Sequence, residues 1–287
     1  MEILQSKIGF MQGRLSPLIE GRIQAFPWPY WQEELAQAGR LGFHLMEWTL
    51  DQDRLYENPL MTTTGQQEIR DLCRAHGVAI PSLTGDCFMQ APFYKAEGSL
   101  RRRLLDDLAR VVVSCAALNI NFVVIPLVDN GALESPAQED ALIQGLAEVR
   151  GLLSDSGVRV VFESDFPPAA LAALMDKFEP RCFGVNYDIG NSAALGFDYR
   201  EEMAAYGRRI LNVHVKDRAF SGGTAPLGTG DADMPGVLGA LKALGYSGNY
   251  ILQTARAADG DHAGALRRYR DMVLNWLKEE EPGEPRT

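Results

Sequence analysis

Three side chains that could bind a metal ion or move a proton, Glu163, Asp188 and His214, each stand at the end of a short apolar run. A fourth such run carries Gln253 in the matching place. The runs are VRVVFES (158–164), CFGVNYD (182–188), ILNVHVKD (210–217) and NYILQT (249–254). Side chains at the carboxyl ends of the strands of a (β/α)8 barrel converge on one pocket. The spacing therefore predicts that these four residues meet around one cation.

The four donors form an oxygen-rich ligand set with one nitrogen and no thiolate. Two carboxylates, an imidazole nitrogen and an amide oxygen suit Mn²⁺, with Mg²⁺, Co²⁺ or Zn²⁺ as alternatives. A lone histidine at a strand end is more often structural, but the acidic groups at two preceding strand ends favour a ligand. We therefore predict a divalent metal ion as the cofactor, with manganese preferred.

Short apolar runs alternate with helix-period segments along the whole chain, which favours βα units and a parallel sheet. We expect strands near 7–11, 44–48, 78–83, 121–127, 159–163, 183–188, 210–215 and 250–254. We expect helices at about 31–41, 64–76, 99–118, 136–155, 168–178, 200–207, 234–244 and 263–278. Eight such units predict an α/β protein, a single (β/α)8 TIM barrel over residues 1–278. The charged, proline-rich tail at 279–287 is expected to fray.

Composition narrows the class of protein. Hydrophobic residues make up 46% and charged residues 23%, as in an ordinary globular protein with a large core. The formal net charge of -10 repels polyanions, which argues against nucleic acid as a substrate. No run reaches the roughly 18 apolar residues that a membrane span requires, and the N-terminus does not read as a secretory signal. The four cysteines are scattered without a C-x-x-C pair, which favours reduced thiols and a cytoplasmic enzyme of small molecules.

One connection is unusually long. Residues 12–30 separate the first strand from its helix by more than the two to six residues that such loops usually take. The loop is rich in bulky groups, including Phe26, Trp28 and Tyr30. One interpretation is a lid whose aromatic faces, Trp28 among them, lie against the substrate. The alternative is a subunit interface or a hydrophobic plug.

Four segments carry a family resemblance: FES (162–164), NYDIGNSAALGFD (186–198), NVHVKD (212–217) and PLGTGDADMPGVLGALKALGYSGNYILQT (226–254). They resemble the xylose-isomerase-like superfamily of sugar phosphate isomerases and epimerases. The resemblance spans nearly the whole chain and is strongest from residue 160 onward. It implies a carbohydrate substrate, a homo-oligomer, and a metal ion held by Glu163, Asp188, His214 and Gln253, with Glu163 also acting as the general base.

Two positions depart from the family pattern. In many epimerases of the family the ligand on the eighth strand is a glutamate that pairs with the first glutamate in acid–base catalysis. Here Gln253 replaces it, and an amide does not accept a proton under ordinary conditions. A histidine three residues beyond the aspartate is replaced by Asn191, which can hydrogen-bond a sugar hydroxyl but cannot titrate. Because inversion of a carbon generally needs bases on two faces, these changes favour isomerisation or dehydration over C3 epimerisation, unless Glu47, His44 or a water supplies the second group.

Other residues could complete the pocket. Lys216 lies two residues after His214, on the same side of the strand, where it could hold a hydroxyl, polarise the carbonyl or form a salt bridge. Glu47 ends the second predicted strand and either contacts substrate hydroxyls or is a structural carboxylate facing the helices. Arg14 follows the first strand and could pair with an acidic group of the substrate. The glycine-rich loop 228–231 invites a phosphate interpretation, but it lacks a nucleotide-binding fingerprint.

The leading hypothesis is therefore a metal-dependent isomerase or epimerase of a small keto sugar, a polyol-derived ketone or a sugar phosphate. It would abstract a proton next to a carbonyl and form a metal-stabilised enediolate, with Glu163 and Lys216 as catalytic residues. The alternatives are a dehydratase of a keto-polyol or cyclic keto acid on the same metal site, and a non-catalytic carbohydrate-binding barrel. A metal-dependent nuclease of the superfamily is disfavoured, because the chain has four histidines and an acidic net charge.

Overall fold

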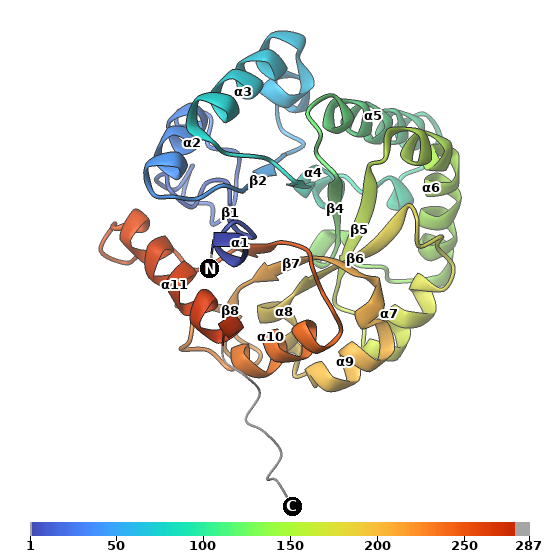
Figure 1. The fold of residues 1–287 in the computed structure, drawn as a ribbon. Helices are drawn as coiled ribbons and strands as arrows, with labels where there is room; N and C mark the ends of the chain where they lie inside the picture. The colour runs from blue at the N-terminus through green and yellow to red at the C-terminus, as the bar shows by residue number, and fades with distance from the viewer. Residues whose placement is uncertain (1, 279–287) are drawn as a thin grey trace, which may run out of the picture.

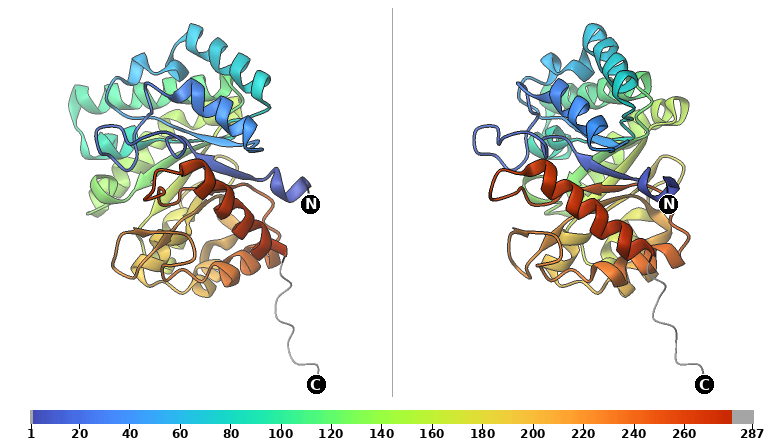
Figure 2. Two further views of the ribbon diagram at one scale, coloured as in Figure 1. Left: turned by 90° about the vertical axis from the view of Figure 1, so that its left-hand side faces the viewer. Right: turned by 60° about the vertical axis from the view of Figure 1, so that its left-hand side comes forward.

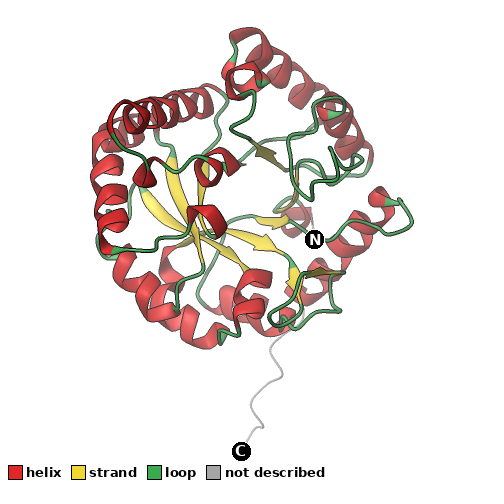
Figure 3. Ribbon diagram, turned by 180° about the vertical axis from the view of Figure 1, so that it is seen from behind, coloured by secondary structure: helices red, strands yellow, loops and turns green. Residues whose placement is uncertain are grey.

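Eight parallel strands close into a barrel in the order β1-β10-β7-β6-β5-β4-β3-β2, with helices surrounding it (Figures 1 and 3). The computed structural model describes residues 2–278. Neighbouring strands of the barrel are parallel throughout, which confirms the predicted (β/α)8 class. The tail at 279–287, predicted to fray, lies outside the described residues.

The elements lie close to their predicted positions. The barrel strands are β1 (Ile8–Met11), β2 (Met46–Thr49), β3 (Ser82–Thr84), β4 (Phe122–Leu127), β5 (Arg159–Ser164), β6 (Phe183–Asp188), β7 (Ile210–Val215) and β10 (Tyr250–Leu252). The helices are α1 (Glu2–Gln5), α2 (Trp31–Arg40), α3 (Thr63–His76), α4 (Asp86–Gln90), α5 (Gly98–Ala117), α6 (Pro136–Ser156), α7 (Pro168–Met175), α8 (Ile189–Leu195), α9 (Tyr199–Tyr206), α10 (Met234–Ala243) and α11 (His262–Lys278). A small hairpin of β8 (Asp217–Arg218) and β9 (Thr224–Ala225) follows β7.

Two differences from the predicted pattern bear on function. Strand β3 begins at Ser82 rather than at residue 78, because Pro81 has no N–H to donate to a neighbouring strand. In addition, the short helices α4 and α8 follow β3 and β6 directly, and neither was predicted. They carry Asp86 and Asn191 at the mouth of the barrel.

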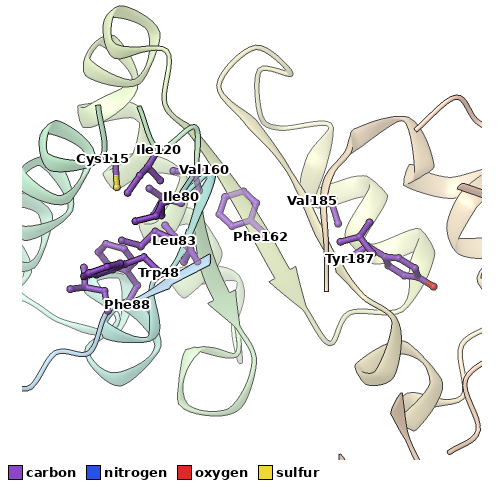
Figure 4. Close-up of a cluster of buried hydrophobic side chains, with 14 of the residues drawn as sticks. Trp48, Ile80, Leu83, Phe88, Cys115, Ile120, Val160, Phe162, Val185 and Tyr187 are labelled. Atoms are coloured by element: carbon purple, nitrogen blue, oxygen red, sulfur yellow. The ribbon is translucent and has the colours of Figure 1, made fainter. Parts of the chain in front are cut away.

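The barrel has an outer and an inner set of buried side chains. The main hydrophobic core lies between the strands and the helices, and Trp48, Leu83 and Phe162 belong to it (Figure 4). Alternate residues of the strands face the interior. On β5, Val161 packs there against Val124, and two residues further along the same side is Glu163. The interior therefore changes from apolar to polar toward the carboxyl ends of the strands.

Long connections gather at one end of the molecule. The segment after β1 and the segment between β7 and α10 project from the end opposite the N-terminus (Figure 2). This is the end at which the catalytic residues of such barrels lie. Within the described residues, no helix combines the length and the apolar character that crossing a membrane requires.

Helix α6 offers a matched test of packing outside the barrel. Replacing Gly145 by alanine would place a Cβ 2.5 Å from Phe93 Cε2 and 3.0 Å from Leu105 Cδ2. We expect the substitution to lower the free energy of unfolding by about 1–3 kcal/mol, the usual cost of overfilling a core. At Gly151 in the same helix a Cβ meets nothing within 4 Å, so alanine should raise that free energy by about 0.5–1 kcal/mol. Urea unfolding measures both, and equal shifts would contradict this packing.

Candidate metal centre and substrate cavity

The carboxyl ends of three adjacent strands, β5, β6 and β7, bring Glu163, Asp188 and His214 together. One potential ligand atom from each lies within 4.8 Å of the others, and all three residues are buried. Asp188 and His214 are directly paired in the register of β6 and β7. The barrel thus assembles two carboxylates and an imidazole, as the sequence predicted for this part of the set.

Amide groups hold the two carboxylates in place. The backbone N–H of Asn191 donates to Asp188 Oδ1 at 2.8 Å, so Asp188 caps helix α8. The side-chain amide of Asn191 donates to Glu163 Oε1 at 2.7 Å, and that of Asn186 donates to Glu163 Oε2 at 2.9 Å. Asn191 therefore contacts both carboxylates and lines the cavity, where it was predicted to bind substrate.

His214 is fixed between two carboxylates. Its Nε2 lies 2.7 Å from Glu47 Oε1 and its Nδ1 lies 3.2 Å from Glu163 Oε2. Burial alone would lower the pKa of His214, but the charge of Glu47 and the hydrogen bonds to Glu163 and Glu47 raise it to about 10. Because Nε2 donates its hydrogen bond to Glu47, Nδ1 faces Glu163, one of the other predicted metal ligands. A histidine that binds a metal ion usually directs its second nitrogen to a carboxylate in this way.

Glu47 lies inside the barrel and not on the cavity wall. It is fully buried, and its Oε2 accepts hydrogen bonds from Ser82 Oγ at 2.6 Å and Asn212 Nδ2 at 2.9 Å. Its Oε1 accepts from Thr84 Oγ1 and from His214. Burial alone would raise the pKa of Glu47, but these partners lower it, so the residue is a carboxylate. Both oxygens have partners within the barrel, which favours a role of Glu47 in orienting His214, while its contact with substrate hydroxyls stays a prediction.

Gln253 faces the same centre through Lys216. The ammonium of Lys216 lies 2.9 Å from Asp188 Oδ2 and 3.5 Å from Gln253 Oε1. A cationic group thus already lies between two of the predicted ligand oxygens. This stand-in cation, together with the three converging donors, indicates that the donor set fits a divalent metal ion.

A cavity of about 670 Å³ opens above these residues. Its wall includes Glu163, Asn191, Lys216 and Gln253, and Arg14 also lines it. The size lies within the usual range for small-molecule sites, which is about 300–1,000 Å³. The cavity therefore combines the predicted base with two of the predicted substrate-binding residues, Asn191 and Arg14.

Three arginines, Arg14, Arg218 and Arg256, line this cavity. Among residues 2–278, none of the three forms an ion pair with a carboxylate. Arg14 instead donates to the carbonyl of Thr254 at 3.1 Å, and burial together with the charge of Arg256 lowers its pKa. The three guanidinium groups are therefore not engaged in ion pairs within the described part of the chain, although the same wall also carries the carboxyl groups of Asp86, Asp129, Glu163 and Asp165.

The loop at 228–231 does not provide a phosphate cradle. Asp217 Oδ2 accepts hydrogen bonds from the backbone N–H groups of Gly228 at 2.8 Å and Gly230 at 2.9 Å. Oδ1 accepts a further one from Ala232. An internal carboxylate thus occupies the amides that could have faced an anion.

The aromatic residues of the loop after β1 do not line the cavity. Phe26 is buried and packs against Trp28 and Trp48, with ring centroids 4.8 and 5.3 Å apart. The guanidinium of Arg54 lies 3.8 Å from the centroid of Trp28. The ring of Trp28 is used in packing and is not among the residues that line this cavity, and its contact with the substrate stays a prediction. His44 is exposed and its ring faces the carbonyl of Gly77, so it cannot supply the second acid–base group.

The loop contributes to the cavity through a polar residue that the sequence did not single out. Gln24 accepts a hydrogen bond from Gln253 Nε2 at 3.0 Å and donates to Asp86 Oδ2 at 2.8 Å. Asp86 also lines the cavity, as do Arg218 and Arg256. For Asp86 a signal was present, since this acidic residue lies three positions beyond the end of the predicted strand at 78–83. For Gln24 no local pattern existed, because its partners are 62 and 229 residues away.

Comparisons with known proteins agree with the fold. The chain matches the family model of the xylose isomerase-like TIM barrel over residues 35–279. It is 25% identical over 256 residues to the L-ribulose-5-phosphate 3-epimerase UlaE of Salmonella typhi, with 85% of this chain and 88% of that protein covered. Two similar solved structures are the IOLI protein with a bound zinc atom (TM-score 0.72, 16% identity, 94% and 98% of the two chains) and D-psicose 3-epimerase in the presence of D-fructose (TM-score 0.71, 12% identity, 95% and 100%).

The role of Glu47 can be tested through metal affinity. We expect Glu47→Gln to weaken binding of Mn²⁺ about 10- to 100-fold, because the imidazole loses the carboxylate that fixes its orientation. Glu202→Gln is the matched control. Glu202 is equally buried and accepts hydrogen bonds from Tyr187 and Tyr206, but it contacts none of the predicted ligands. Titration calorimetry should show an affinity within about twofold of wild type for the control, and equal weakening of both variants would contradict the assignment.

Proposed function

Because the chain belongs to the xylose isomerase-like TIM-barrel family, we propose that it is a metal-dependent isomerase or epimerase of a small keto sugar or its phosphate. The observation that carries this proposal is the convergence of Glu163, Asp188 and His214 within 4.8 Å beside a cavity of about 670 Å³. The relatives named as sugar epimerases support the same class of reaction.

The four predicted ligands would hold the cation. Glu163, Asp188, His214 and Gln253 supply hard oxygen donors with one nitrogen, for which we propose Mn²⁺ as the preferred ion. When bound, a divalent ion polarises the substrate carbonyl and stabilises the negative charge that develops on its oxygen. Two carboxylates are enough to balance its charge.

Glu163 is the proposed base. It lines the cavity at 7% exposure, and its two oxygens are held by Asn191, Asn186 and His214. A carboxylate fixed in this way can take a proton from the carbon next to the carbonyl without first reorganising. Lys216, on the same wall, would donate a hydrogen bond to a substrate oxygen once a metal ion replaces its contact with Asp188.

The arginines favour a phosphorylated substrate. A phosphate group offers several anionic oxygens, and guanidinium groups match them with paired hydrogen bonds. Arg256 is suited to this, since its Nε is buried without a hydrogen-bond partner within the described chain. UlaE, which is similar to this chain, is named for L-ribulose 5-phosphate. We therefore propose a ketose phosphate as the substrate.

Solvent exchange tests the reaction. In D2O with Mn²⁺, the protein should introduce deuterium next to the carbonyl of a 2-ketopentose 5-phosphate, and chelation should stop the uptake until metal is restored. Glu163→Gln should abolish uptake, while Asp129→Asn at the exposed rim should not. Mass spectrometry measures the label. Loss of one water from the substrate would instead indicate a dehydratase, and ligand-induced stabilisation without any exchange would indicate a binding protein.

Phosphate recognition is tested at Arg256. We expect Arg256→Met to raise KM for a ketopentose 5-phosphate about 10- to 100-fold with little change in kcat, as when one charged hydrogen-bonding group is removed. KM for the unphosphorylated ketopentose should stay the same. Arg74→Met, at an exposed position on α3, is the control. Equal effects of Arg256→Met on both substrates would contradict a phosphate-binding role.

A further inference from the structure

Asp86 is a second buried carboxyl group on the cavity wall, which also carries Gln253, the amide that replaces the family's glutamate. Asp86 lies two residues beyond the end of β3, is 6% exposed, and shares the cavity wall with Glu163 and Gln253. Gln253 cannot carry a proton between substrate and solvent. The cavity wall therefore contains a titratable group, Asp86, beyond the end of β3, whereas the amide of Gln253 lies at the end of β10.

Asp86 is held through one intervening side chain. Gln24 donates to Asp86 Oδ2 at 2.8 Å, and its own Oε1 accepts from Gln253 Nε2 at 3.0 Å and from Arg14 Nη2 at 3.3 Å. Asp86 Oδ1 makes no hydrogen bond within the described chain. One oxygen is thus fixed while the other remains available to a ligand.

The other carboxyl groups of the wall are placed differently. Asp129 is exposed and Asp165 is half-buried. Glu163 is held by residues of β6, β7 and α8, whereas Asp86 is held by the loop after β1. The two buried carboxyl groups of the cavity wall therefore reach it from different strand ends and are oriented by different parts of the barrel.

The surroundings of Asp86 keep a proton within reach at neutral pH. Burial raises the pKa of Asp86 to about 7. The charges of Asp51 and Glu163 act in the same direction. The hydrogen bond from Gln24 and the charge of Arg14 oppose them. A group that is half-protonated at the working pH can both donate and accept a proton.

We propose that Asp86 is the second acid–base group of this enzyme, so that Asp86 and Glu163 exchange protons with the same substrate carbon from its two faces. This inference rests on the proposed function and makes it more specific. It assigns the chain to the epimerases, although Gln253 by itself favours a reaction with one base.

The proton balance is simple. The Glu163 carboxylate removes the proton from the carbon next to the carbonyl, and the electron pair of the broken C–H bond moves onto the carbonyl oxygen to give an enediolate. The protonated Asp86 then donates its proton to the opposite face of that carbon, and the carbonyl re-forms. Asp86 is left as a carboxylate and Glu163 as an acid, and exchange with water restores both. The reverse reaction uses the two residues in exchanged roles.

The test uses the metal-loaded protein with L-ribulose 5-phosphate and its C3 epimer in D2O. We expect Asp86→Asn to slow epimerisation at least 100-fold, while Glu163 still exchanges the C3 hydrogen of one epimer with retention of configuration. The other epimer should not exchange. Asp140→Asn, at an exposed position on α6 outside the cavity wall, should behave as wild type. NMR of the recovered sugars distinguishes label from inversion.

The pH dependence provides a second measurement. In the wild type, the rate of epimerisation in the direction in which Asp86 acts as a base should rise with pH through about 7. The rate in the opposite direction should fall through the same pH. Asp86→Glu should retain part of this behaviour. Because the folded protein holds the Asp86 proton between the unfolded pKa of about 3.9 and about 7, its stability should fall with rising pH in that window. The Asp86→Asn variant should lack this loss of stability with rising pH, so the variant should be folded at pH 8.

The outcomes separate the two proposals. If Asp86→Asn epimerises within about threefold of wild type, or loses exchange of both epimers equally, Asp86 is not the second acid–base group and the proposed function stands. If the wild type exchanges no hydrogen of either epimer, the proposed function on ketopentose phosphates is contradicted, and the role of Asp86 is contradicted with it.

Discussion

The site depends on one buried ion pair, between Glu47 on β2 and His214 on β7. Both residues are fully buried inside the barrel, and their atoms Oε1 and Nε2 are 2.7 Å apart. A carboxylate in such a place costs several kcal/mol unless its hydrogen-bonding capacity is filled. Ser82, Thr84 and Asn212 fill it, so strands β2, β3 and β7 are tied together across the interior. The polar interior is therefore stable only as a complete network, and that network fixes the direction of the imidazole.

From this fixed imidazole the rest of the centre follows. Because Nε2 is committed to Glu47, Nδ1 faces Glu163, which in turn is held by Asn186 and Asn191. The contact of Lys216 with Asp188 adds a positive charge where a metal ion would otherwise balance the carboxylates. The chain thus places its donors by hydrogen bonds that do not require the cation. A site prepared in this way loses little conformational entropy when the cation binds.

The barrel could be predicted from the sequence because alternating apolar runs and helices admit few other folds, and the strand ends of a barrel must converge. The residues at those strand ends, such as Glu163 and His214, could therefore be predicted as site residues from the sequence. What could not be predicted depends on long-range contacts. The ring of Trp28 packs against Phe26, which in turn packs against Trp48, and no period in the sequence reports these contacts. Helices α4 and α8 have only 5 and 7 residues, which is too few to produce a recognisable helical period in the sequence.

In the proposed site, Gln253 as a ligand and Asp86 as a proton carrier would separate the charge of the metal centre from proton transfer. A third carboxylate among the ligands would make the centre net negative and weaken its pull on substrate electrons. An amide at 253 avoids this, since it offers an oxygen without a charge. A proton carrier placed off the metal keeps its pKa under the control of burial, and Asp86 lies in such an environment. The hydrogen bonds through Gln24 connect the two positions, so the loop after β1 would orient the acid and the neutral ligand at the same time. In this arrangement the loop reaches the cavity through Gln24 and Arg14, while Phe26 and Trp28 pack beneath it.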